Sequence, residues 1–401
     1  MKHCLIAKIT TLLHHAPLVQ NLARKKFIAR FVVGLFKSRN VQFCEIAQHL
    51  NDRVKLASNE TRIQDFFREV PLDYLALATL LVHLLPGQGK LRLCLDRTEW
   101  DFGKCQVNIL LVTVGRGDCH WPLCWELLDN RSGNSNADDR TALLDFCLRV
   151  LGPDRVGLVV GDREFVGHQW FKYLKDKGLF FVMRLPKHHL LTDRRGRSYA
   201  VAEWNLQPGQ CRRLAECQVD GVWGGAQVTA LAGGEYLFLF GTANPTYLGQ
   251  LYRKRWTIEA CFQNLKGRGF ALRGTHLQCR AKLKKLVGLV SLAYALCVSV
   301  GTQLHEKVQP IDLKKHGYKR ASFSRHGLNA LRQYSRSGHW ADKAFTASLN
   351  AVLRWIVQQV TLYQATKIVG WSSRPQNLPE LCAVRPPQPE RGNRPRNRIA
   401  V

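Results

Sequence analysis

Four residues between positions 252 and 266 have the types and spacing needed to hold a metal ion beside a phosphate. At 100° per residue of an α-helix, all four project from one narrow arc. That arc presents a carboxylate beside a phenol and two cations, which suits a metal ligand whose neighbours bind phosphate oxygens. An ordinary surface helix with an ion pair one turn apart fits the same spacing. The four residues are Tyr252, Arg255, Glu259 and Lys266.

Two further carboxylates follow stretches that have the pattern of β-strands. Asp96 is predicted to end the alternating strand of residues 91–95, on the face opposite the leucines, and Asp162 directly follows the apolar run 156–161. A carboxylate at the end of a buried strand is costly unless it is paired, so each is either salt-bridged or a ligand. Together with Glu259, they are three acidic residues that could converge on a hard cation such as Mg²⁺.

The net charge of the chain indicates a polyanionic partner. The 401 residues include 59 Lys and Arg against 30 Asp and Glu, which leaves a net charge of +29. This excess is larger than solubility requires, and either nucleic acid or an anionic membrane surface would satisfy it. With 46% hydrophobic and 22% charged residues, the composition argues against disorder and against a fibrous repeat.

Neither the cysteines nor the apolar runs indicate a secreted or membrane-spanning protein. The 13 cysteines include no Cys-x-x-Cys pair, which favours free thiols in a reducing compartment. The apolar runs 74–85 and 286–301 are shorter than the ~18 to 20 residues that span a bilayer, so we expect two buried core helices. The first residues also lack a signal-peptide layout, and no membrane partner is expected.

Residues 1–88 are predicted to form an all-α domain that binds DNA. An amphipathic helix over 41–50, a turn, and a helix over 59–70 capped by Ser58 fit a helix-turn-helix. Two core helices of a bundle would have the same pattern. In the DNA-binding interpretation the second helix turns three polar residues outward, namely Arg62, Gln64 and Arg68.

The middle of the chain is predicted to be a mixed α/β domain over residues 89–305. Three apolar strands that can pair as a meander are followed by helix, strand, helix and strand, which is typical of a mixed sheet. Short alternating runs with glycine turns indicate a small antiparallel insertion at about 197–241. Helices are expected again over 246–266 and 281–302, then a helical region over 306–371 and a flexible basic Pro/Arg tail over 372–401.

The four-residue spacing resembles the Tyr-Arg-Glu-Lys signature of the insertion-sequence-four family of DDE transposases. At roughly 1 in 20 per residue type, four fixed letters arise by chance in a chain of this length only about a few times in a thousand. Asp96 in LCLDRTEW and Asp162 in VVGDREF resemble the first and second aspartates of that family. The resemblance runs from the ETRIQDFF stretch to the SFSRHGL stretch that begins at Ser322.

The resemblance implies a ribonuclease-H-like core that performs cut-and-paste transposition. Asp96, Asp162 and Glu259 would be the catalytic residues and would bind two Mg²⁺ ions, for which Mn²⁺ may substitute. One ion would activate water or a 3′-hydroxyl, and the other would stabilise the leaving oxygen. The DNA phosphates near the cut would be contacted by the cationic and phenolic members of the signature, Tyr252, Arg255 and Lys266.

The resemblance also implies partners and a hairpin step. The partners would be the double-stranded terminal inverted repeats and target DNA, with a homodimer in the synaptic complex and a cytoplasmic, nucleoid-associated location. A flipped base would stack on an aromatic residue; the tryptophan expected there is absent, and Tyr236 is the first candidate, although it also suits a plain sheet position. A catalytically silent DNA-binding protein and a nuclease without strand transfer remain alternatives.

Overall fold

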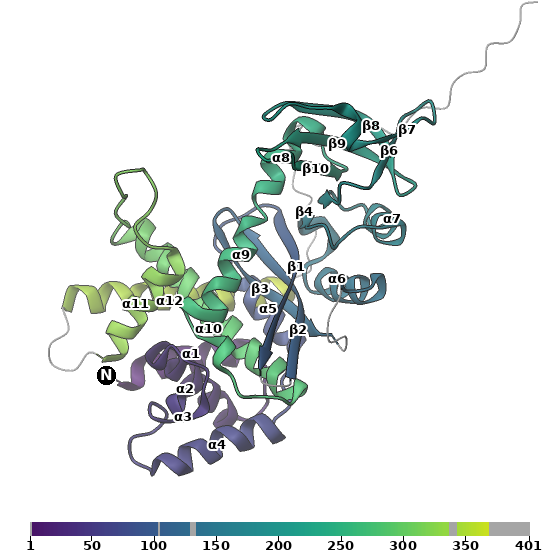
Figure 1. Cartoon of the computed structure of the whole chain (residues 1–401). Coiled ribbons are helices and arrows are strands. Elements are labelled where there is room, and N and C mark those ends of the chain that lie inside the picture. The colour runs from purple at the N-terminus through teal and green to yellow at the C-terminus, as the bar shows by residue number, and fades with distance from the viewer. Residues whose placement is uncertain (1, 103–104, 129–133, 337–342, 369–401) are drawn as a thin grey trace, which may run out of the picture.

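The computed structural model describes residues 2–102, 105–128, 134–336 and 343–368 (Figure 1). The predicted Pro/Arg tail over 372–401 lies entirely outside these residues. The described strands form one sheet in the order β3-β2-β1-β4-β5-β10-β9-β8-β6-β7. They are β1 (Leu91–Phe102), β2 (Cys105–Arg116), β3 (Cys119–Leu127), β4 (Val156–Gly161), β5 (Phe181–Leu185), β6 (Leu190–Thr192), β7 (Ser198–Ala200), β8 (Cys211–Val219), β9 (Val222–Ala230) and β10 (Tyr236–Gly241).

Helices surround the core half of this sheet and make up both ends of the described chain (Figure 1). They are α1 (Lys2–His15), α2 (Leu22–Ser38), α3 (Phe43–Ala47), α4 (Leu56–Glu69), α5 (Tyr74–His83), α6 (Ala137–Leu151), α7 (His168–Asp176), α8 (Pro245–Arg253), α9 (Trp256–Gln263), α10 (Arg280–Lys307), α11 (Phe323–Arg336) and α12 (Lys343–Ile368). A π-helical turn, η3 (Asn264–Arg268), follows α9, and 3-10 turns lie at η1 (Pro153–Arg155), η2 (Val201–Trp204) and η4 (Leu272–Gly274).

The core of the sheet is mixed, as the sequence predicts. Strands β1, β2 and β3 form an antiparallel meander, whereas β1, β4 and β5 run parallel. Parallel strands are covered on both faces, which explains why β4 and β5 consist almost entirely of apolar residues. Asn136 begins α6 with a reciprocal capping box to Asp139. This mixed α/β arrangement is consistent with a ribonuclease-H-like core.

Strand β1 is longer than the sequence pattern indicated, so the prediction that Asp96 ends it is wrong. The strand continues to Phe102 and pairs with β2 along its whole length. Thr98 and Trp100 lie on the same face of the strand as Asp96, opposite the leucines, and both are buried. Asp96 therefore lies in mid-strand, where the backbone on both sides is held by the sheet.

The inserted strands continue the core sheet and do not form a separate unit. The first of them, β6, begins at residue 190, earlier than the predicted boundary near 197. Strand β10 returns to pair with β5, Phe238 lying opposite Leu185. This pairing satisfies the backbone groups that β5 would otherwise expose as an edge strand. In Figure 1 the insertion forms the upper end of the molecule, above α6 and α7.

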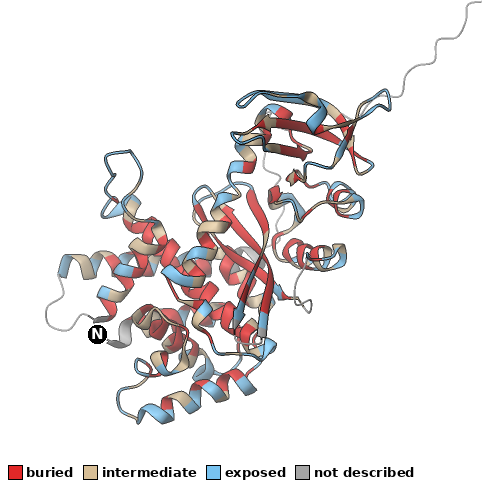
Figure 2. Ribbon diagram, viewed as in Figure 1, coloured by how far each residue is buried: buried red, intermediate tan, exposed pale blue. Residues whose placement is uncertain are grey.

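The long apolar helix α10 is the central helix of the helical half. With 28 residues it is long and apolar enough to cross a membrane. The apolar run 286–301 is only part of this helix, so its shortness does not rule out a membrane span. However, 94% of its most apolar window is buried inside the protein. Figure 2 shows it as a buried element among the surrounding helices. Burial, and not length, identifies it as the core helix that the sequence predicts.

The predicted helix-turn-helix is present with different boundaries. The first helix, α3, has only five residues, and α4 begins at Leu56, so Ser58 is not its cap. The buried Asn59 side chain instead donates to the carbonyl oxygens of Ala47 and Asn51, at 3.0 and 2.9 Å, and so holds α4 against α3. These two bonds satisfy carbonyl groups at the end of α3 and in the turn that follows it.

A buried lysine attaches α4 to the core. The Lys285 ammonium on α10 donates to the carbonyl oxygens of Phe66 and Phe67, at 3.3 and 2.9 Å, near the C-terminal end of α4. It also lies 5.6 and 5.9 Å from the centroids of the two phenylalanine rings. A cation at this end of a helix is favoured by the helix dipole. Lys285 therefore positions the helix that carries the predicted DNA-contacting residues.

We predict that Lys285→Met destabilises the protein, because it removes the ammonium group that donates to the carbonyl oxygens of Phe66 and Phe67, of which only Phe66 also accepts from the Val70 N–H. The expected loss is about 1–3 kcal/mol of unfolding free energy, measured by calorimetry or chemical denaturation. Lys282→Met on the same helix is the matched control, since Lys282 is only partly buried. Equal effects of the two substitutions would contradict the role of Lys285.

Candidate active site

Three carboxylates from three elements surround the guanidinium of Arg255. Its Nη1 lies 3.2 Å from Asp96 Oδ2 on β1 and 3.8 Å from Asp162 Oδ2, which directly follows β4. Its Nη2 forms a close ion pair with Glu259 on α9. The Arg255 side chain is 12% exposed and the carboxylates are 20 to 31% exposed. The structure thus brings together four of the residues that the sequence analysis selected.

The register of the parallel pair β1 and β4 places the two aspartates side by side. Cys94 lies opposite Val160, and two residues further along each strand stand Asp96 and Asp162. The backbone N–H of each following residue, Arg97 and Arg163, donates at 2.8 Å to Oδ1 of its aspartate. These local bonds orient both carboxyl groups, so that Oδ2 of each faces Arg255.

The predicted continuous helix over 246–266 is three segments. Helix α8 ends at Arg253, a two-residue turn contains Arg255, and α9 is followed by the π-helical turn η3. A π-helical turn closes one residue later than an α-turn, so residues beyond it leave the 100° register. Lys266 consequently lies off the predicted arc: its Nζ donates to the Glu99 carbonyl at 3.3 Å and lies 5.5 Å from the Trp100 ring centroid.

Tyr252 contacts both the arginine and the second aspartate. Its hydroxyl donates to Asp162 Oδ1 at 3.0 Å, and the Arg255 guanidinium lies 5.6 Å from the centroid of its ring. Burial, followed by the charge of Asp162, raises the pKa of Tyr252 well above its usual value, so the phenol remains a donor. Its position therefore fixes the orientation of both Asp162 and Arg255.

Burial and charge act in opposite directions on the ionisable groups of this site. Burial raises the pKa of Asp96 to about 6, although Arg255 and the N–H of Arg97 lower it. Burial by itself lowers the pKa of Arg255, but Tyr252 and the three carboxylates together raise it above its usual value. Lys266 behaves differently: burial, with the nearby charge of Arg273, lowers its pKa to about 8. The site is thus held by a cation among carboxylates that are partly removed from water.

An ion pair that the sequence analysis missed links the two aspartate-bearing strands. Arg97 Nε donates to Glu164 Oε2 at 3.0 Å, and these residues follow Asp96 and Asp162 by one and two positions. The other oxygen of Glu164 accepts from the backbone and hydroxyl of Ser135, at 2.8 and 2.7 Å. The repeated Asp-Arg dipeptide in the DRTE and DREF stretches was the available sequence signal.

The aromatic and DNA-contacting candidates have different surroundings. Tyr236, the first residue of β10, is half-buried opposite Ala230, whereas Trp256, beside Arg255, is 66% exposed and was not singled out from the sequence.

Of the predicted DNA-contacting residues, Arg62 and Gln64 are exposed on α4. Arg68 is also exposed, but it is paired with two neighbouring carboxylates, those of Asp65 and Glu69.

The carboxylates fit a divalent metal by their chemistry, with one condition. Carboxylate oxygens are the donors that Mg²⁺ and Mn²⁺ prefer. Among the residues that the structure describes, no group of three His, Cys, Asp or Glu side chains is arranged to hold a metal ion. The guanidinium of Arg255 lies between the three carboxylates, so metal binding requires it to move aside.

Comparison with known families decides the identity of the domain that carries this site. The family model of the transposase DDE domain matches residues 93–296, about half of the chain. The chain belongs to the DDE transposase family. The match spans β1 to α10 and so includes all three carboxylates of the site. No curated protein matches the chain.

Membership of this family explains the general properties of the transposase. DDE transposases act on DNA, the polyanion that a net charge of +29 suits. Their DDE domains generally use divalent metals, which agrees with the donor set around Arg255. The DDE transposase is accordingly an enzyme of nuclease or transposase type, and the roles of its individual residues are proposals developed below.

We predict that the melting temperature of Asp96→Asn, minus that of the unaltered transposase, increases as the pH rises from 5 to 7. The folded-state pKa of about 6 lies above the usual 3.8, so ionisation of Asp96 costs folding free energy as the pH rises through this range. Asparagine carries no such cost. Calorimetry without added metal measures the difference, and Asp101→Asn at the exposed end of β1 is the control. A difference that is constant with pH would contradict the prediction.

Proposed function

We propose that this protein is a cut-and-paste transposase of the insertion-sequence-four type, with Asp96, Asp162 and Glu259 as catalytic residues. The observation that carries the proposal is the convergence of these carboxylates on Arg255 from two strands and a helix. The Tyr-Arg-Glu-Lys spacing and the inserted strands between Asp162 and Glu259 support the same subfamily. The reaction would cleave at the terminal inverted repeats and join the ends to target DNA.

In this proposal the carboxylates hold two Mg²⁺ ions, or Mn²⁺ in their place. Bound metal would supply activation of an attacking hydroxyl and stabilisation of the leaving oxygen in an in-line displacement at phosphorus. Arg255, released from the carboxylates, would direct its planar fork to the oxygens of the scissile phosphate. Tyr252 would keep Asp162 oriented through the hydroxyl bond already present. Lys266, beside Trp100, would contact a neighbouring phosphate.

The proposed division of labour follows the predicted domains. Residues 1–88 would recognise the terminal repeats, residues 89–305 would carry the catalytic core, and the helical region over 306–371 would complete the DNA-binding surface. Each active site acts on one DNA end, so a synaptic complex that holds two ends would contain a homodimer. Arg62 and Gln64 are the proposed base-contacting residues, because Arg68 is already paired within α4.

A hairpin intermediate would require an exposed aromatic face for the displaced base. Tyr236 is the candidate from the sequence, but its ring is half-buried in the sheet. Trp256 is better placed, since it is 66% exposed and directly follows Arg255. An indole also offers a larger stacking face than a phenol. We therefore propose Trp256, in addition to Tyr236, as a candidate base-stacking residue.

We predict that Asp96→Asn, Asp162→Asn and Glu259→Gln each abolish DNA nicking while DNA binding is retained. Removal of a residue that hydrogen-bonds a metal ligand lowers metal affinity or activity by about 10- to 100-fold, so removal of a ligand itself should lower them further. The assay is Mg²⁺-dependent nicking of a terminal-repeat duplex beside a gel shift. Asp101→Asn and Glu203→Gln, both exposed, are the controls. Full cleavage by any of the three variants would remove that residue from the site.

We predict that Arg62→Ala and Gln64→Ala reduce the preference for terminal-repeat over random DNA by about 1–3 kcal/mol each. Substitution is a sharper test than deletion of residues 1–70, because that segment supplies buried residues such as Phe31 and Phe36 to the core. Competition binding measures the preference. Arg53→Ala, an exposed charge before α4, is the control, and an unchanged preference in both test variants would place recognition elsewhere.

We predict that Trp256→Ala selectively lowers hairpin formation and leaves first-strand nicking nearly intact, because stacking returns about 1–3 kcal/mol of the unstacking cost. Tyr236→Ala should show a smaller effect, since its ring is half-buried. The two products are scored separately on the same duplex, and Trp256→Phe should restore part of the yield. Equal loss of nicking and hairpins would indicate a structural role.

A further inference from the structure

Arginines from the two ends of the described chain meet over the π-helical turn that follows α9. Arg39, which ends α2, donates from Nη2 to the carbonyl oxygen of Arg268 at 2.6 Å. Arg325 on α11 donates from its own Nη2 to the same oxygen at 3.4 Å. The two nitrogens therefore lie within 6.0 Å of each other, the sum of these distances. A third arginine, Arg332, follows two turns later on α11.

Two members of this cluster, Arg39 and Arg325, are short of negative charge. Neither Arg39 nor Arg325 forms a salt bridge to a carboxylate within the part of the chain that the structure describes. The Arg39 Nε is buried and has no hydrogen-bond partner among the residues that the structure describes. Burial, together with the charges of Arg325 and Arg332, lowers the pKa of Arg39. A backbone carbonyl offsets only part of this repulsion, so Arg39 and Arg325 have no anionic partner among the described residues, although their geometry would accept one.

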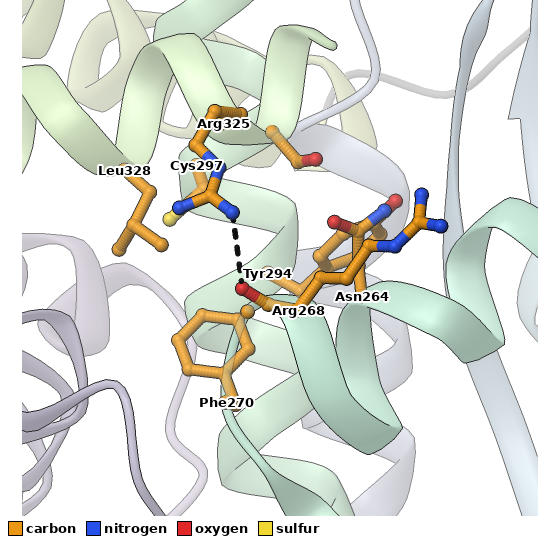
Figure 3. Close-up of a pocket in the computed structure, with 9 residues that line it drawn as sticks. Asn264, Arg268, Phe270, Tyr294, Cys297, Arg325 and Leu328 are labelled. Atoms are coloured by element: carbon orange, nitrogen blue, oxygen red, sulfur yellow. Dashed lines mark hydrogen bonds between the residues drawn. The ribbon is translucent and has the colours of Figure 1, made fainter. Parts of the chain in front are cut away.

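The cluster lies next to the proposed catalytic helix and is reachable from solvent. The turn η3 begins directly after α9, and Arg268 is its last residue, two positions beyond Lys266. Both hydrogen bonds to the Arg268 carbonyl are exposed. Figure 3 shows the Arg325 guanidinium reaching over a small pocket toward that carbonyl, while the Arg268 side chain extends away from it. Single π-helical turns are rare and frequently mark functional sites.

The chemistry and the size of the site favour a phosphate group lying on its rim. The pocket beneath the guanidinium has room for about one water molecule, so a larger ligand would stay at the surface. Guanidinium groups bind phosphate oxygens through charge-assisted bonds of about 2.8 Å. Two nitrogens that lie within 6.0 Å of each other can both reach oxygens of one phosphate.

We propose that Arg39 and Arg325 form a seat for one phosphodiester of the DNA backbone, away from the scissile phosphate. The proposal rests on the DNA transposase function proposed above and adds a site outside the carboxylate cluster. Arg39 belongs to the N-terminal helices, whereas Arg325 and Arg332 belong to α11. One bound phosphate would therefore tie both ends of the chain to the turn after the catalytic helix.

The test compares the salt dependence of DNA binding by the full chain and by the double variant Arg39→Gln/Arg325→Gln. Loss of one phosphate contact should reduce the slope of log affinity against log salt concentration by about 1. Arg149→Gln, which removes an exposed charge on α6, should leave the slope unchanged. An unchanged slope in the double variant, with salt-dependent binding by the unaltered chain, overturns the seat. Absence of binding by the unaltered chain would instead overturn the proposed DNA function.

Two further measurements separate a phosphate seat from a purely structural clamp. Arg39→Lys keeps the charge and should keep the slope, whereas Arg325→Gln alone should lower it without unfolding the protein, because its bond to Arg268 is long. A lower melting temperature in both variants with unaltered slopes would overturn the proposal. Inorganic phosphate is the second probe: stabilisation by phosphate with no change in the DNA slope would identify a free-phosphate site and overturn the DNA assignment.

Discussion

Electrostatic repulsion among three carboxylates is the constraint on which the site depends. Asp96, Asp162 and Glu259 are partly removed from water, where like charges repel more strongly than in solvent. Arg255 offsets this repulsion by contacting all three, and its guanidinium lies over the ring of Tyr252, whose hydroxyl donates to Asp162. The turn that separates α8 from α9 places Arg255 between them. A metal ion at this position would replace one source of positive charge with another.

The sheet supplies the rigidity that this arrangement needs. The parallel register of β1 and β4 brings the two aspartates to adjacent positions, and the Arg97 to Glu164 pair joins the segments just beyond them. Glu164 in turn holds Ser135, directly before the capping box of α6. Movement of either aspartate would therefore disturb a strand, a helix start and a half-buried ion pair together. Such supporting contacts are what hold reacting groups in place.

The helical parts are attached to the core through backbone carbonyl groups. Lys285 holds α4 by the carbonyls of Phe66 and Phe67, and Arg39 and Arg325 share the carbonyl of Arg268. In each case a long cationic side chain crosses between segments far apart in sequence. These attachments use charges that a DNA-binding protein has in excess. They also make the position of α4 dependent on the core, so that the proposed recognition of the repeats and the proposed cleavage would be mechanically connected.

The sequence by itself determined the elements that depend on near neighbours. Apolar runs predicted the three-stranded meander and the mixed sheet that follows it, and the spacing of the signature residues selected Tyr252, Arg255 and Glu259. Only the tertiary structure decided that β1 continues past Asp96, that β10 joins β5, and that Lys266 leaves the shared arc. The reason is physical: periodicity is set by residues a few positions apart, whereas strand partners, ion pairs and a π-helical turn depend on contacts between segments distant in the chain.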